Sequence, residues 1–284
     1  MKFNKNFKDS VFTKLFSDPD VLRELYCALG GVSLPSDVPV SINTLENVLY
    51  MDLYNDISFQ IGGKLVVLIE HQSTINLNIA LRLLLYVVKV LEKTVKGKSL
   101  YSTKQLLIPY PEFYVLYNGT EPYPDERILR LSDLFEKPQD LGVPEKDHPL
   151  LELEVKVINI NEGRNEAIVN RCKKLSEYST FVATVRSFLN NFENKEEALK
   201  ETVKYCQKHA ILGEFLEIHG SEILNMLLTE WNWDDAKEVW QEEAREEGRA
   251  ESIRDIAINL LAKGSAPEFI QEITGLDIET ISKL

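Results

Sequence analysis

The chain has 284 residues, of which 44% are hydrophobic and 27% are charged, and its net charge is −13. These values are typical of a soluble globular protein, with room for one sizeable domain and a smaller one. They exclude a membrane-spanning protein, because the richest apolar run, residues 79–91, is short and contains Arg82 and Lys89. The first ten residues lack the apolar core of an export signal. We therefore expect a cytoplasmic protein with no membrane partner.

The cysteines and histidines indicate neither a disulfide framework nor a zinc site. Cys27, Cys172 and Cys206 are far apart and odd in number, and the four histidines do not have zinc-ligand spacing. We expect the three cysteines to be free thiols in a reducing compartment.

A helical pattern with an internal break comes first in the chain. Apolar residues recur with helical periodicity between Phe7 and Leu29, and Ser17-Asp18-Pro19 predicts an end and a restart within this span. The loop 30–39, with two glycines and two prolines, separates it from strand-like sequence at residues 47–53.

The most informative stretch reads as a β-hairpin. Residues 57–61 and 64–70 have strand character, and paired glycines at 62–63 supply the positive φ angles that a tight two-residue turn needs. A hairpin brings its far ends together. The pattern therefore predicts that Asp56 lies beside Glu70.

This end of the hairpin is a candidate metal site. Side chains alternate along a strand, so Glu70 and Gln72 share one face and His71 takes the other. The carboxylates of Asp56 and Glu70 would repel one another, so the site needs a divalent cation or a shared proton. Oxygen ligands favour Mg²⁺ or Mn²⁺ over Zn²⁺.

An apolar helix from Leu77 to about Thr94 should follow and pack on the sheet. Its residues Arg82 and Tyr86 are four apart and share a face. Arg82 could reach a phosphate near the site or form a salt bridge that ties the helix to an acid. The stretch from Tyr86 to Lys104 holds five lysines against one acid, so we take Lys89 and Lys93, together with Arg82, as candidate phosphate contacts.

The rest of the expected core contains two strands and a long connection. Glu112–Tyr117 reads as a buried central strand, and the alternating segment 150–160 as a strand with one solvated face. The polar, proline-rich segment 120–147 between them predicts a connection, with a short helix or turn at residues 131–135.

From residue 165 onward the sequence predicts helices only: 167–178, 181–189, 195–209, 215–228 and 235–262. Residues 230–284 hold 14 acids and 6 bases, so most of the net negative charge lies in this tail. The last residues have helix-turn-helix spacing, with Pro267 opening one helix, a turn at Gly275 and a second helix from Asp277. That second helix offers only Lys283 as a base, so we favour a protein-contact or homo-oligomer role over DNA reading.

The spacing of Asp56, Glu70 and Gln72, an Asp followed about a dozen residues later by Glu-x-Gln across a hairpin, resembles the signature of the PD-(D/E)xK nuclease superfamily, with Gln in place of the usual Lys. More narrowly, the strings LIEHQSTINLNIALRLLLYVVKVLEK and FKDSVFTKLFSDP resemble the Rpn-type recombination-promoting nucleases, also labelled PD-(D/E)xK family transposases. The likeness covers roughly residues 7–180.

The resemblance implies an α+β fold with a restriction-endonuclease-like core over residues 1–180, that is, a mixed sheet flanked by helices. An all-helical C-terminal region would follow, with a helical extension at 181–230 and an acidic helical tail at 231–284. It also implies an acid on the leading helix near the metal. Asp9 is the candidate, and a simple helix cap is the other interpretation of this residue.

The implied activity is hydrolysis of DNA phosphodiesters by a Mg²⁺-dependent or Mn²⁺-dependent endonuclease, linked to recombination, mobile elements or defence against foreign DNA. Asp56 and Glu70 would hold the metal, and Gln72 would orient a water or a phosphate oxygen. The alternative is a catalytically degenerate nuclease fold that acts as a regulatory or protein-interaction scaffold, which the absent Lys and the acidic charge favour. RNA cleavage stays open, because the chemistry at phosphorus is shared.

Overall fold

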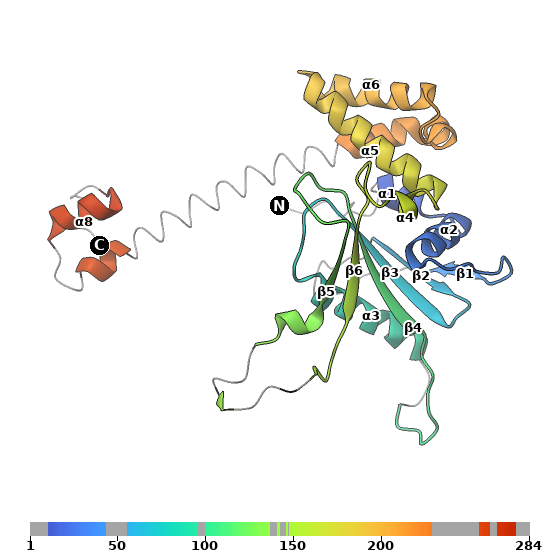
Figure 1. Cartoon of the computed structure of the whole chain (residues 1–284), viewed down its shortest axis with the longest axis horizontal. Helices are drawn as coiled ribbons and strands as arrows, with labels where there is room; N and C mark the ends of the chain where they lie inside the picture. Colours follow the sequence, from blue (N-terminus) through green and yellow to red (C-terminus); the bar gives the residue numbers. More distant parts are fainter. Residues whose placement is uncertain are drawn as a thin grey trace. The chain divides into compact units, whose positions relative to one another are not determined.

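The computed structural model (Figure 1) describes residues 11–43, 56–95, 100–136, 141–142, 146, 148–228, 256–261 and 266–276. The chain divides into two compact units, Met1–Leu227 and Leu228–Leu284. The first unit contains the sheet and most of the described helices, and the second contains a short helical region.

One mixed β-sheet forms the centre of the first unit (Figure 1). Its strands lie side by side in the order β1-β2-β3-β4-β6-β5. Neighbouring strands are parallel for β3–β4 and β4–β6, and antiparallel for the other three pairs. The strand bounds are β1 Val40–Ile42, β2 Ile57–Ile61, β3 Leu65–Gln72, β4 Tyr110–Tyr117, β5 Glu126–Arg130 and β6 Glu154–Asn159. Because β3, β4 and β6 are parallel, their carboxyl ends meet at one edge of the sheet.

The hairpin of β2 and β3 forms as the sequence predicts. Gly62 and Gly63 turn the chain with φ angles of 57° and 64°, and Ile57 pairs with Ile69 at the open end. Two consecutive positive φ angles suit glycine because it has no Cβ to clash with the backbone. This register places Asp56 opposite Glu70.

Helix α3 (Ile79–Val95) covers one face of the sheet, as expected from its apolar sequence. Its buried side chains pack on alternate residues of the strands, which point to the same face of the sheet. The fully or nearly fully buried members of this cluster include Leu83, Tyr86, Val66, Leu68, Val115, Tyr117, Val155 and Val157. This packing fixes the first turns of α3 beside the end of β3.

Helices on the opposite face begin with α1 (Val11–Leu15) and α2 (Pro19–Gly30). The side chain of Asp18 caps α2 by accepting a hydrogen bond of 2.7 Å from the N–H of Asp20, which is the restart that the sequence predicts. Phe12 of α1 stacks on His71 of β3. This contact shows that α1 lies on the face of the sheet opposite α3.

The later part of the described chain is helical. It comprises α4 (Glu166–Val169), α5 (Lys173–Asn191), α6 (Lys195–Lys208), a helix over residues 213–228 and, in the second unit, helical residues 256–261 and α8 (Pro267–Thr274). Gly275 ends α8 in the left-handed conformation with a φ of 73°. Among the residues that the structure describes, we find no helix that is both long and apolar enough to cross a membrane. An α+β core with C-terminal helices is thus the fold class that we expect from the sequence.

The structure differs from the expected elements in three places. The segment 120–147 is not only a connection, since strand β5 lies within it, whereas the short helix expected at residues 131–135 is present as a 3₁₀ helix (Leu131–Leu134). The separate helices expected at 167–178 and 181–189 are a short α4 and one continuous α5, because the chain breaks at Cys172, which has an extended backbone, and no helix breaker lies between 178 and 181. Strand β1 follows the loop 30–39 without having been predicted.

Several predicted features lie outside the described residues. These are the strand at 47–53, most of the helix at 235–262 and the helix from Asp277.

Candidate active site

Asp56 and Glu70 lie opposite one another at the open end of the β2–β3 hairpin. Glu70 is the sixth residue of β3, and its side chain is only 4% exposed. Asp56 directly precedes β2, and its Oδ2 accepts a hydrogen bond of 2.7 Å from the backbone N–H of His71. The two acids therefore lie on neighbouring strands at the edge where the parallel strands end.

Arg82 of α3 contacts the buried glutamate. Its Nη2 lies 3.2 Å from Oε2 of Glu70 and donates a second hydrogen bond of 3.2 Å to the hydroxyl of Tyr86. The side chain of Arg82 is 28% exposed, so within this ion pair the arginine is in contact with solvent while the glutamate is buried. Of the two interpretations of Arg82, the structure contains the salt bridge that ties α3 to an acid.

Burial governs the protonation of this cluster. It raises the pKa of Asp56 to about 6, against the opposing effects of the His71 N–H and of Arg82. Burial alone would lower the pKa of Arg82, but the Glu70 carboxylate and its other neighbours raise it above the usual value. Arg82 is therefore a permanent positive charge beside two acids, one of which titrates close to neutral pH.

His71 joins this site to the helices on the other face of the sheet. Its ring stacks on Phe12 with a centroid separation of 4.7 Å, and its Nε2 shares a hydrogen bond of 3.1 Å with the hydroxyl of Tyr178 in α5. Burial, together with the positive charge of Arg186, lowers the pKa of His71 to about 3. The ring is thus a neutral anchor, while the backbone of the same residue holds Asp56.

Gln72 ends β3 and lies against the loop after β4. It pairs with Tyr117, and its carbonyl accepts a hydrogen bond of 3.0 Å from the N–H of Asn118. A Cβ at Gly119 would lie 2.0 Å from the carbonyl oxygen of Ser73, so only glycine allows this approach. The ends of β3 and β4 are therefore held together directly beside Gln72.

Arg186 of α5 connects this loop to the end of β6. Its Nη1 donates a hydrogen bond of 2.8 Å to Oδ1 of Asn161, and its Nη2 donates to the carbonyl of Asn118. Asn161 in turn donates through Nδ2 to the carbonyl of Gly119 at 3.0 Å. Arginine and asparagine side chains thus satisfy backbone acceptors that a strand end leaves unpaired.

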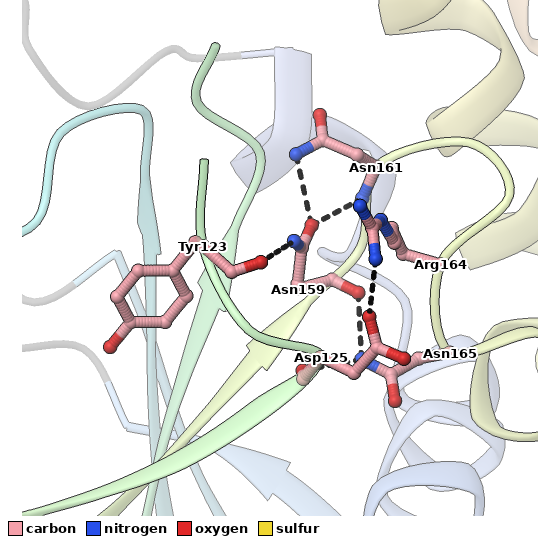
Figure 2. A network of polar contacts seen from close by, with 6 residues as sticks. All are labelled: Tyr123, Asp125, Asn159, Asn161, Arg164 and Asn165. Carbon is pink, nitrogen blue, oxygen red and sulfur yellow. Dashed lines mark hydrogen bonds and ion pairs between the residues drawn. The ribbon is translucent and has the colours of Figure 1, made fainter. Parts of the chain in front are cut away.

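Figure 2 shows how the same edge continues toward β5. Nδ2 of Asn159 donates to the carbonyl of Tyr123 at 3.1 Å, and Nδ2 of Asn165 donates to the carbonyls of Asn159 and Asp125 at 2.9 Å and 2.5 Å. Arg164 and Asp125 form an ion pair of 3.2 Å, but both side chains are more than half exposed, so it contributes little. These amide hydrogen bonds hold the end of β6 and the following loop against the chain that leads into β5.

The structure places the predicted site residues as follows. Asp56, Glu70 and Arg82 come together, and Gln72 lies two residues beyond Glu70 on the same strand. Asp9 lies outside the described residues. Lys89 and Lys93 are seven and eleven residues after Arg82 on α3, so they continue its side of the helix away from Glu70.

Three residues that support the site were not predicted from the sequence: Tyr178, Arg186 and Gly119. Tyr178 is 107 residues from His71 and Arg186 is 68 residues from Asn118, and no local pattern marks such a pairing. The sequence Asn-Gly after a strand indicates a tight turn at Gly119. It does not indicate that Gly119 approaches the carbonyl of Ser73 closely.

The donor atoms fit a hard divalent cation. Among the described residues no group of three or more His, Cys, Asp and Glu side chains is placed to hold a metal. Two carboxylates at one site nevertheless suit Mg²⁺, which is commonly bound by one or two carboxylates together with water and substrate phosphate. Gln72 lies two residues beyond Glu70 on the same face of β3, so its amide oxygen is a further candidate ligand.

Comparison with family models gives a match to the family described as "Putative transposase, YhgA-like" over residues 42–203, which is more than half of the chain. Comparison with curated proteins and with solved structures gave no match. The matched segment includes the β2–β3 hairpin, α3 and all the strands that follow. The chain therefore belongs to the YhgA-like transposase family, which is the Rpn-type, PD-(D/E)xK-like family that its sequence resembles.

Proposed function

We propose that the protein is a metal-dependent endonuclease that hydrolyses phosphodiester bonds in DNA. Its family relates it to mobile elements and hence to DNA. The observation that supports the proposal best is the pairing of Asp56 with the buried Glu70 at the strand edge. A carboxylate that is 4% exposed and faces a second acid serves no simple surface role.

The chemistry follows from the ligands. Asp56 and Glu70 would hold one or two Mg²⁺ or Mn²⁺ ions. Such an ion lowers the pKa of a bound water and neutralises charge that develops on the phosphate. The neutral side chain of Gln72 can accept from the attacking water or donate to a phosphate oxygen. The hydrogen bond from the His71 N–H keeps one oxygen of Asp56 in a fixed position.

The basic side of α3 supports a path for the DNA backbone. Arg82, Lys89 and Lys93 span eleven residues of helix, or about 16 Å at 1.5 Å per residue. Loss of either lysine should weaken binding to all DNA sequences equally, because phosphate contacts carry no sequence information.

The test is nicking of supercoiled plasmid in Mg²⁺, Mn²⁺ or EDTA by the wild type, Glu70→Gln and Glu112→Gln. Glu112 is a matched control, because it is a half-buried glutamate on the adjacent strand β4, held by the hydroxyls of Tyr26 and Tyr114 at 3.2 Å and 2.8 Å on the other face of the sheet. We expect metal-dependent nicking by the wild type and Glu112→Gln, and at least a hundredfold loss in Glu70→Gln.

Equal inactivity of all three proteins on plasmid, linear and single-stranded DNA would overturn the nuclease proposal. The scaffold interpretation would then be favoured, since Gln72 lacks the charge of the usual Lys. Activity that survives in Glu70→Gln would show that the reaction comes from a contaminant or another site.

A further inference from the structure

We propose that Arg82 is an exchangeable counter-ion of the active site. It neutralises Glu70 while no divalent cation is bound, and it moves to the phosphate of the substrate once a cation takes its place at Glu70. This inference rests on the proposed metal-dependent function and adds a defined role for a residue of α3.

The ion pair between Arg82 and the buried Glu70 does not have the geometry of a strong arginine–carboxylate pair. Only one guanidinium nitrogen, Nη2, reaches the carboxylate, at 3.2 Å, and the same nitrogen also serves Tyr86. The strong arrangement of these groups is bidentate, with two parallel hydrogen bonds of 2.7–2.9 Å. Among the described residues, Nη1 and Nε of Arg82 have no hydrogen-bond acceptor. The fork that suits a phosphate is therefore still unused.

Tyr86 provides a pivot for the movement. Its side chain is 1% exposed within the α3 core, and its ring lies 5.9 Å below the guanidinium carbon of Arg82. The aromatic face can therefore keep the guanidinium of Arg82 beside the site while its nitrogens change partner. The side chain of Arg82 is 28% exposed, so the guanidinium can turn toward solvent without disturbing the core.

Charge balance favours the exchange. Asp56 and Glu70 together carry two negative charges when ionised, and Arg82 returns one positive charge. A divalent cation added to this set leaves one excess positive charge, which repels Arg82 from the shared carboxylate. The single negative charge of one phosphodiester restores neutrality, and Arg82 is the group beside the site that can bind it in a bidentate way.

The first experiment measures Mn²⁺ affinity without DNA by isothermal titration of the wild type, Arg82→Met, Arg82→Lys and Arg130→Met. We expect about tenfold tighter Mn²⁺ binding in Arg82→Met, because the competing cation is gone, and wild-type affinity in Arg82→Lys. Arg130 of β5 is the matched control, since it pairs with Glu154 of β6 at 2.9 Å and both side chains are about half exposed. Arg130→Met should bind Mn²⁺ as the wild type does.

The second experiment measures the salt dependence of binding to a short duplex, in Ca²⁺ and in EDTA. With Ca²⁺ at the carboxylates, Arg82→Met should lose about one unit from the slope of log affinity against log salt, because one phosphate contact is lost. In EDTA, Arg82→Met and the wild type should have the same slope, because Arg82 of the wild type is then paired with Glu70 and does not contact the DNA.

Two results would overturn the exchange. One is Mn²⁺ affinity in a folded Arg82→Met protein that equals or falls below that of the wild type. The other is an equal loss of slope in Ca²⁺ and in EDTA, which would make Arg82 a permanent DNA contact. If the wild type binds Mn²⁺ but cleaves no DNA, the nuclease proposal fails. The Mn²⁺ titration alone then tests the exchange. A wild type that binds no Mn²⁺ refutes both.

Discussion

The backbone N–H of His71 donates a 2.7 Å hydrogen bond to Oδ2 of Asp56, so the residue between Glu70 and Gln72 holds the first acid of the candidate site. The ring of the same residue is fixed on the other face of the sheet by Phe12 and Tyr178. One residue thus transmits the packing of α1 and α5 to a carboxylate on the α3 side. This arrangement leads to the first two predictions.

Tyr178→Phe should lower the free energy of unfolding by about 1 kcal/mol, because the hydroxyl loses a buried hydrogen bond to Nε2 of His71. The ring contact with Phe12 should remain. Urea denaturation followed by circular dichroism measures the effect. Tyr205→Phe, at a 40% exposed position, is the control and should be neutral within a few tenths of a kcal/mol. Equal effects of the two changes would refute an anchoring role.

His71 should make the protein sensitive to acid. Its pKa is about 3 in the folded state and near 6.5 in the unfolded chain, so the unfolded state holds more protons between these values. The stability that the neutral ring provides is therefore complete above pH 6.5 and is lost as the pH falls toward 3. In His71→Phe the fall in melting temperature between pH 6.5 and 4.5 should be smaller than in the wild type. A parallel decline in both proteins would contradict this assignment.

Asp56 should have the opposite pH dependence. Its folded pKa of about 6 lies above the ordinary value of 3.8, so its contribution to stability is complete below pH 3.8 and is lost as the pH rises through 6. In metal-free buffer, Asp56→Asn should therefore raise the free energy of unfolding at pH 8 by about 2–3 kcal/mol. The gain should vanish near pH 3.5. Denaturation in EDTA at both pH values tests this, and a gain that does not depend on pH would show that ionisation is not its cause.

Much of the fold could be predicted because its pattern is local. Paired glycines between two apolar runs specify the β2–β3 hairpin, and the apolar helix after it specifies α3. Strand β5 could not be predicted, since among its residues only Leu129 is buried, which leaves no alternation to detect. Strand β1 is three residues long, which is too short for any periodicity.

In the candidate site, too, the residues placed by local patterns could be predicted and those placed by tertiary packing could not. Hairpin geometry alone brings Asp56 to Glu70, and helical spacing puts Arg82 beside Tyr86. Residues that support the site from α5 could not be found, because their partners are defined by tertiary packing of distant segments. Asp9, which the resemblance alone suggests, stays a prediction.

Gly119→Ala should destabilise the protein by about 1–3 kcal/mol, because the added Cβ would meet the Ser73 carbonyl at 2.0 Å and neither backbone segment can yield without moving a strand end. The shift should also disturb Gln72 and lower any nuclease activity. Gly213→Ala is the control, since a Cβ there meets nothing closer than 3.8 Å. Thermal unfolding that is unchanged in Gly119→Ala would mean that the loop after β4 adjusts freely.

The outermost described strands of the sheet have a consequence for aggregation. Strand β1 offers only three residues to an incoming chain, and β5 carries the charged residues Glu126, Arg127 and Arg130, two of which pair with Lys156 and Glu154 on β6. Short strands and fixed charges discourage another chain from adding to a sheet. Concentrated protein should therefore resist amyloid-like growth at these two borders, even though the sheet between them is built from strongly apolar strands.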